Sequence, residues 1–192
     1  MAKDEQFTIE ILEQGWAGDG AETAATDLCS HGKLRITIGG TVVADSTEEF
    51  GISETALALL RTLARNHSPT DPIAGWFEGK PGAERLVFHG CGLILMMGCP
   101  IGMDWTVEHL PKDRVRLSNV RRWDNTSDTP TVSFHGLSVE IPESEYRKAV
   151  IRFATDAKRL FAGVKKTFYA EWDCQQYQKF WEEYDQALAR FS

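Results

Sequence analysis

Near the start of the chain, apolar and polar residues alternate in the pattern of a half-buried β-strand. In residues 7–12 the apolar side chains of every second position share one face, and threonine and glutamate lie between them. Two further β-favouring runs, 33–38 and 41–44, flank Gly39 and Gly40. Because two glycines between such runs form the tight turn of a hairpin, the sequence predicts a β-hairpin here.

Four more strands are predicted in the middle of the chain. The runs are 85–88, 103–109, 114–120 and 133–141, the last interrupted at residues 135–136. Short separations between strands are typical of antiparallel neighbours, which need only a turn to connect them. We therefore expect an antiparallel sheet of about five to seven strands.

Three helices are predicted from apolar side chains spaced at three and four residues. The first follows the hairpin, with Ser53 as its N-cap and residues 66–69 ending it. The second opens at Pro142 and runs to Val164, and the third begins near Asp173. Helices packed on an antiparallel sheet make an α+β fold.

The last helix carries an aromatic stripe from Tyr177 to Leu188, and aromatic residues continue upstream to Phe168. Helical spacing of apolar residues usually marks a face packed on the core, which is the interpretation we favour. The alternative is an aromatic face that binds a partner.

Length and composition indicate one domain spanning residues 1–192. The chain is 42% apolar and 26% charged, and no linker rich in proline, glycine or serine divides it. No apolar run is long enough to cross a bilayer, and the first residues carry acids where a signal peptide would be basic and then apolar. We therefore expect a cytoplasmic protein, in which the four cysteines would be reduced thiols.

The net charge of −7 argues against nucleic-acid binding, which needs a basic face to displace counterions from phosphates. The one concentrated basic run, residues 114–122, is followed by the acids of 124–128, which we expect to neutralise part of its field. An acidic surface instead attracts basic proteins.

The segment 89–104 is the strongest candidate for chemistry, because it combines glycines, two thiols and an imidazole. Two pairs at i, i+2 spacing, Cys29 with His31 and His89 with Cys91, would each share a strand face. Together with Cys99 they could hold a zinc ion. No C-x-x-C motif supports this, and buried thiols beside a turn are the more common arrangement. The favoured interpretation has no cofactor.

A cysteine nucleophile is a second chemical possibility in the same segment. Cys91 or Cys99 would need a nearby imidazole to lower the thiol pKa, with Asp104 or Glu108 orienting that imidazole. The spacing does not choose among the histidines available, which are His31, His89, His109 and His135. The apolar run 93–97 would raise a thiol pKa, which weakens this hypothesis. A metal- or thiol-dependent enzyme is therefore the alternative to a binding protein.

In size, acidity and α+β pattern the chain resembles the immunity proteins of bacterial contact-dependent growth inhibition and related toxin systems. The resemblance implies a non-catalytic protein that neutralises a basic partner, a toxin domain, and it carries no individual residue across. For such a partner we expect steering by carboxylates, including Asp45, Glu48 and Glu49, and anchoring by aromatic rings. The predicted anchors are Trp76, Phe77 and Trp123. A structural subunit of an assembly is a third class.

Overall fold

A computed structural model describes residues 5–73, 85–89, 101–127 and 129–192. Within these residues nine strands form one sheet, and every strand pair is antiparallel. The strands are β1 (Phe7–Gly15), β2 (His31–Ile38), β3 (Thr41–Ala44), β4 (Phe50–Gly51), β5 (Val87–His89), β6 (Gly102–Leu110), β7 (Arg114–Trp123), β8 (Val132–Ser133) and β9 (Ser138–Pro142). The helices are α1 (Ala21–Thr26), α2 (Ile52–Thr62), α3 (Glu143–Arg159) and α4 (Glu171–Phe191).

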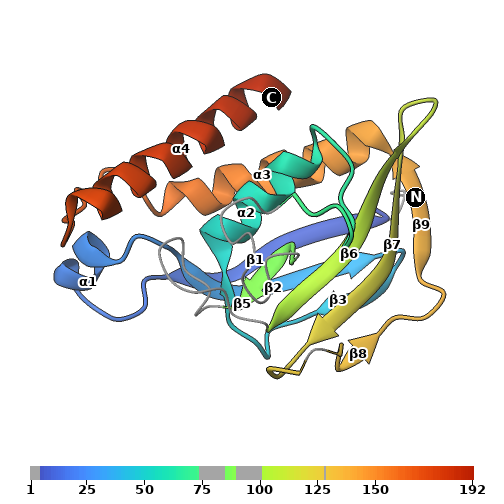
Figure 1. Cartoon of the computed structure of the whole chain (residues 1–192), viewed down its shortest axis with the longest axis horizontal. Coiled ribbons are helices and arrows are strands. Elements are labelled where there is room, and N and C mark those ends of the chain that lie inside the picture. The colour runs from blue at the N-terminus through green and yellow to red at the C-terminus, as the bar shows by residue number, and fades with distance from the viewer. Residues whose placement is uncertain (1–4, 74–84, 90–100, 128) are drawn as a thin grey trace.

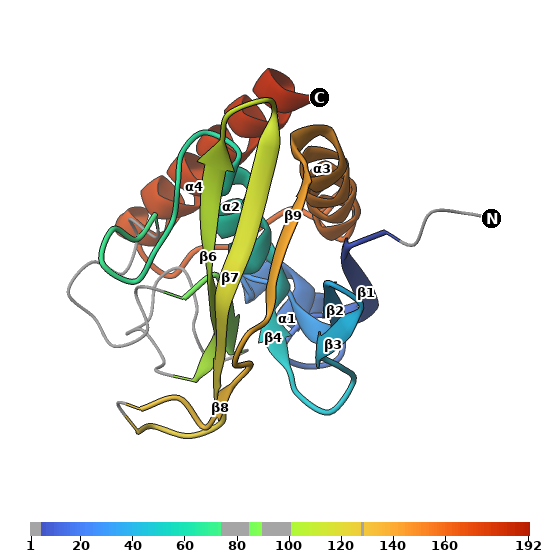
Figure 2. The same ribbon diagram turned by 90° about the vertical axis from the view of Figure 1, so that its right-hand side faces the viewer.

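The strand order is β1-β2-β4-β5-β6-β7-β8, with β3 paired to β2 and β9 paired to β7. Helices α2, α3 and α4 gather on one side of this sheet (Figures 1 and 2). The prediction of an α+β fold, with a helix after the first hairpin and two C-terminal helices, is confirmed. The predicted strand 133–141 is divided into β8 and β9, and neither the two-residue strand β4 nor the short helix α1 was predicted.

The core lies between the sheet and these three helices. Phe7 of β1 packs against Trp105 of β6 and Tyr146 of α3, with ring centroids 6.2 and 5.1 Å away. The hydroxyls of Tyr146 and Thr62 lie 2.8 Å apart, so the buried phenol has a hydrogen-bond partner in α2. No helix in the described part of the chain is long and apolar enough to cross a membrane.

The aromatic stripe of α4 mostly packs inward. Phe180 and Tyr184 are buried, and the Tyr184 hydroxyl donates to the Ala154 carbonyl of α3 over 2.7 Å. Trp181 stacks obliquely against Phe161, with centroids 4.5 Å apart. The favoured interpretation of the stripe, a helix face packed on the core, is confirmed for these residues.

Candidate functional site

Three arginines of the basic run on β7, Arg116, Arg121 and Arg122, are paired with carboxylates. Arg116 donates to Glu108 of β6 over 2.9 Å and to Glu140 of β9 over 2.6 Å. Arg122 contacts Asp124, with Nε 2.7 Å from Oδ1. Cross-strand pairs of this kind leave little net positive field on the face.

Beside Arg122, carboxylates are in excess. Glu48 reaches the Arg122 Nε at 3.7 Å, so the loop between β3 and β4 meets the end of β7. Burial raises the pKa of Glu48, and repulsion from Asp124 and Asp45 raises it further against the attraction of Arg122. Glu48 and Asp124 therefore share one arginine, and Asp45 and Glu49 add two more exposed carboxyls to the same loop.

Trp123, predicted as a surface anchor, is buried with 3% of its surface exposed. The Arg85 guanidinium carbon lies 3.3 Å from the centroid of its ring, so a cation covers the face that a partner would need. The expectation of an exposed Trp123 is therefore wrong. The other two predicted anchors, Trp76 and Phe77, lie outside the described residues.

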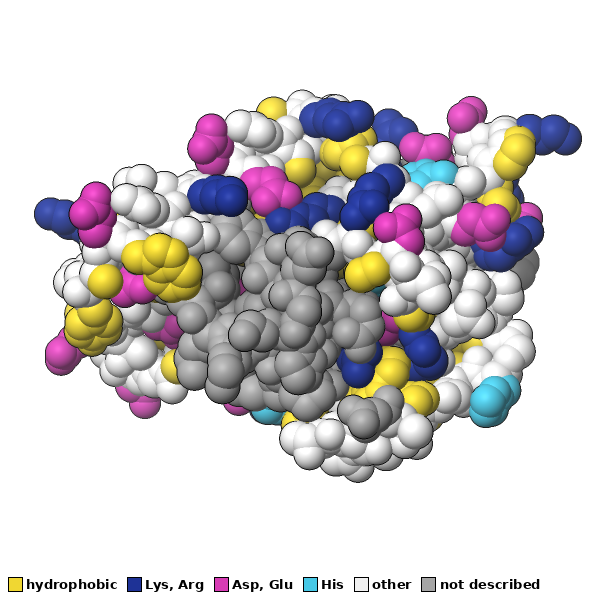
Figure 3. Space-filling model, in the orientation of Figure 1, with side chains coloured by type: hydrophobic (Ala, Val, Ile, Leu, Met, Phe, Trp, Pro, Cys, Tyr) yellow, Lys and Arg dark blue, Asp and Glu magenta, His cyan; other side chains and the backbone are white. Residues whose placement is uncertain are grey.

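Two other aromatic side chains are exposed instead, at the start of α4. Tyr169 is 86% exposed and Trp172 is 54% exposed. The segment that carries them is fixed to α1, because Thr167 donates its amide to the Ala25 carbonyl over 2.8 Å. On this side of the molecule, hydrophobic side chains lie at the surface beside acidic ones (Figure 3).

Lys166 also attaches this segment to α1, and these contacts occupy its ammonium group. Its Nζ donates to the carbonyls of Ala24 and Asp27, over 2.8 and 2.5 Å, and lies 3.6 Å from the Trp16 ring centroid. Burial lowers the pKa of Lys166 to about 8. The ammonium is thus occupied by the carbonyls of Ala24 and Asp27 and by the Trp16 ring.

The predicted pair Cys29 and His31 lies in a buried polar cluster. Asp27 Oδ2 is 3.2 Å from His31 Nε2. Burial raises the pKa of Asp27, but the hydrogen bonds from His31 and two backbone amides outweigh it and hold that pKa below the ordinary value of 3.8. Glu54 is also buried here, and burial raises its pKa despite hydrogen bonds from Cys29 and Ser53.

His89 lies near this cluster, with β4 between its strand and β2. Gly32 of β2 and His89 of β5 both pair with Phe50 of β4. Within the described ranges, no group of three or more histidine, cysteine, aspartate and glutamate side chains could hold a metal ion. Cys91 and Cys99 lie outside those ranges, so the zinc and thiol hypotheses stay predictions.

Asp104, predicted to orient a catalytic histidine, has a different partner. It is fully buried; His67 Nε2 lies 2.7 Å from its Oδ1, and Arg121 donates to its Oδ2 over 3.0 Å. The Ile73 amide donates to His67 Nδ1 over 3.2 Å, so the imidazole carries its proton on Nε2 and has no free nitrogen. His67 and Arg121 therefore engage both carboxylate oxygens of Asp104, and the histidine beside it is His67 and not one of the predicted histidines.

The other predicted partners of a thiol are also engaged elsewhere. His109 Nε2 lies 2.8 Å from the Thr62 carbonyl oxygen, and Glu108 pairs with Arg116. His67 itself was missed from the sequence, because it lies in the loop after α2, 37 positions before Asp104. The structure therefore brings none of the described candidate histidines to Asp104.

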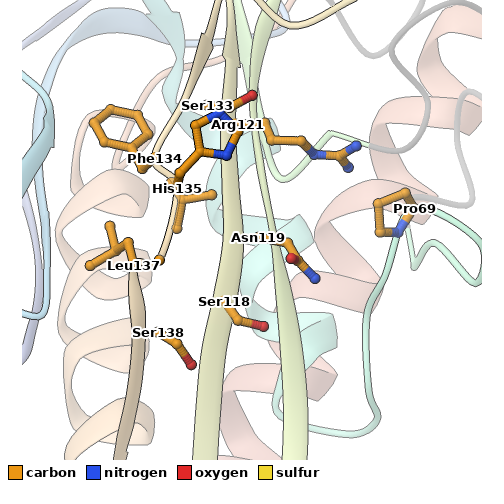
Figure 4. A pocket seen from close by; sticks show the side chains of 11 residues that line it. Pro69, Ser118, Asn119, Arg121, Ser133, Phe134, His135, Leu137 and Ser138 are labelled. Carbon is orange, nitrogen blue, oxygen red and sulfur yellow. The ribbon is translucent and has the colours of Figure 1, made fainter.

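A cavity of about 410 Å³ lies beside β7 (Figure 4). Strand β7 bulges here, because Asp104 pairs with Arg121 but Thr106 pairs with Ser118. Within the bulge Asn119 has a φ of 54°, in the left-handed region that asparagine tolerates better than most residues. The described lining consists of Pro69, Ser118, Asn119, Val120, Arg121, Ser133, Phe134, His135, Gly136, Leu137 and Ser138.

No family model, curated protein or solved structure matches this chain.

Proposed function

We propose that this protein is a cytosolic, non-catalytic binding protein that captures and neutralises a basic protein partner, a toxin domain. The observation that carries the proposal is the grouping of unpaired carboxylates at the surface of an acidic protein. The described residues provide no ion-pair partner within 4.0 Å for five exposed carboxylates: Asp19, Glu22, Asp45, Glu49 and Glu171.

Unpaired carboxylates of this kind accelerate encounter with a cationic protein. Complementary charge raises association rates by attracting the partner before contact, and salt screens the effect within about 10 Å at 0.1 M. The carboxylates lie in two places, the loop 45–49 and the end of the molecule formed by α1 and the start of α4. Either could face the partner during approach.

Tyr169 and Trp172 supply the contact that charge alone does not. Exposed aromatic rings are frequent binding hot spots, because they bury a large apolar area and lose little conformational entropy. Glu171 lies between them in the sequence, so a basic partner would meet apolar rings and an unpaired carboxylate together. Lys166 does not neutralise this surface, because its ammonium is engaged with α1.

The experiment is a viability test in bacteria. The C-terminal domain of the protein encoded immediately upstream is expressed with and without this chain, and the purified pair is tested for a complex. Survival that depends on this chain, with a stable complex, supports the proposal. A harmless upstream product, or cell death in the presence of this chain, contradicts it.

Variants then test the surface. Tyr169→Ala with Trp172→Ala should weaken the complex by about 100-fold, since each lost hot-spot ring costs about 1–2 kcal/mol. Val42→Ala is the matched control, because Val42 is an apolar side chain of β3 that is 52% exposed. Equal affinity of the double variant and the control would exclude the aromatic pair as the contact.

A charge series tests steering separately. Asp45→Asn with Glu49→Gln removes two unpaired carboxyls from the loop 45–49. Asp19→Asn with Glu22→Gln removes one carboxyl from the segment before α1 and one from α1 itself. Substitution of the pair that faces the partner should slow association by about three- to tenfold at low salt, and much less at high salt. If neither pair changes the association rate, electrostatic steering by these carboxylates is excluded.

A further inference from the structure

We propose that the cavity beside the β7 bulge binds a small molecule through an anionic group, a phosphate or a carboxylate. This site is independent of the proposed partner surface, because it is built from β7, the segment 133–138 and Pro69. Figure 4 shows these side chains arranged around the bulge, with Pro69 on one side and the 133–138 segment on the other.

The backbone fixes the shape of the cavity. The Phe134 amide donates to the Val120 carbonyl over 3.0 Å, which ties the turn after β8 to the bulge. The turn then closes on itself, as the Leu137 amide donates to the Phe134 carbonyl over 3.1 Å. Gly136 has a φ of 76°, which allows this tight path before β9 begins. The walls are therefore formed before any ligand binds.

The chemistry of the lining is unusual for this protein. The chain carries a net charge of −7, yet the described lining contains no carboxylate. It offers hydrogen-bond donors instead, from the Arg121 guanidinium, the His135 imidazole, the Asn119 amide and three serine hydroxyls. A set of donors without a competing carboxylate fits an anionic oxygen group better than a cation.

Two of these donors are held in place by neighbours. Arg121 uses Nη2 to bond the buried Asp104, which orients the guanidinium, and a guanidinium has five N–H groups in all. Asn119 uses one amide hydrogen on Thr106 Oγ1, over 3.2 Å, and keeps the second. Donors that are already oriented cost little entropy when a ligand binds.

The expected affinity is modest for a bare anion. Asp104 balances much of the Arg121 charge, so binding depends on hydrogen bonds more than on net attraction. Inorganic phosphate alone should therefore bind with a Kd of about 1 mM, near 4 kcal/mol. The volume of about 410 Å³ leaves room for the rest of a small molecule, since ligand sites usually measure 300–1,000 Å³.

The test is a titration followed by amide ¹H–¹⁵N chemical shifts, with sodium phosphate in one arm and sodium succinate in the other. Sodium chloride at matched ionic strength is the blank. We expect saturable shifts at residues 118–121 and 133–138 in one or both arms, and none of them in chloride. Tighter phosphate binding identifies a phosphorylated ligand, and tighter succinate binding a carboxylate.

Three variants decide whether the lining is responsible. His135→Ala and Asn119→Gly should each weaken binding by about fivefold or more, the loss of one hydrogen bond. Glycine accepts the φ of Asn119, so the bulge survives. Lys112→Gly is the control: Lys112 also has a positive φ, 66°, but lies on the β6–β7 turn, away from the cavity, and its loss removes a cation. The Lys112→Gly variant should bind the anion with the same affinity as the unchanged protein.

The proposal fails if no saturable shift is seen, or if chloride reproduces the shifts. It also fails if both lining variants bind as well as the unchanged protein. Equal weakening by Lys112→Gly would show diffuse attraction to positive charge, which would overturn the site as well. None of these outcomes depends on the basic partner.

Discussion

Replacing Asp104 by asparagine should test the buried polar group most severely. The two side chains have nearly the same shape, but asparagine has one oxygen where aspartate has two. Arg121 and His67 both donate to Asp104, and His67 cannot change its tautomer because the Ile73 amide already donates to Nδ1. Whichever way the new amide turns, its NH₂ group faces a donor. The variant therefore places two donors together in a buried site.

The magnitude follows from the hydrogen bonds and the ion pair that the substitution breaks. A hydrogen bond involving a charged group contributes about 1.5–3 kcal/mol, and breaking a fully buried ion pair costs about 3–5 kcal/mol. The side chain of Arg121 is 28% exposed, so water relieves part of the cost on its side. We therefore expect a loss of about 3 kcal/mol in the free energy of unfolding, which lowers Tm by about 6–12 °C for a chain of this size.

The assay is urea denaturation at pH 7, followed by tryptophan fluorescence, with the slope m compared between variants. A double-mutant cycle with Arg121→Gln isolates the pair. Once the guanidinium is gone, the asparagine oxygen can face His67 and its NH₂ can face the vacated side. The double variant should then be more stable than the sum of the single losses predicts, by about 1 kcal/mol or more. A loss below about 1 kcal/mol for Asp104→Asn, or strict additivity, would refute the reasoning.

Three further substitutions test other parts of the fold. Burial raises the pKa of Glu54 in the folded protein, so the fold is stabilised while this acid is protonated and loses that stabilisation as pH rises above 4.5. Glu54→Gln should therefore make Tm fall less steeply with pH in this range, and an unchanged Tm–pH slope would contradict this. Gly32→Ala should cost about 3 kcal/mol by urea denaturation, since its Cβ would lie 1.9 Å from the Glu13 carbonyl oxygen, whereas Gly15→Ala, with nothing within 4 Å, should cost under about 0.5 kcal/mol. Tyr184→Phe removes a buried hydrogen bond to α3 and should lose about 1 kcal/mol in the same assay; no loss would show that this bond contributes nothing.

Periodicity predicted the regular elements because their burial is itself periodic. On β2, Leu34, Ile36 and Ile38 are buried at every second position, as the sequence pattern indicates. The last helix is similar, since Phe180 and Tyr184 are one turn apart and both buried. In these segments, the side chains that the local pattern marks as apolar are the same ones that the tertiary packing buries.

The polar groups could not be predicted in the same way. His67 lies in a loop after α2, and only the folding of that loop along β6 places it against Asp104. Trp123 lies at the end of a strand, after two arginines and before an aspartate, a polar setting that suggests exposure. In the fold, Arg85 covers its ring from a distant part of the chain. Such contacts have no periodic signal, because neither partner repeats along the sequence.

The bulge that forms the cavity did leave a trace in the sequence. Strict alternation on β7 would place Asn119 on the face that buries Leu117, where an unpaired amide would be costly. The extra residue in the bulge lets Val120 take the core position instead, and Asn119 adopts the left-handed conformation at the surface. The same break in alternation turns Arg121 toward Asp104. A polar residue out of phase in an otherwise regular strand thus predicts a bulge, and here the bulge both orients an arginine and opens the space beside it.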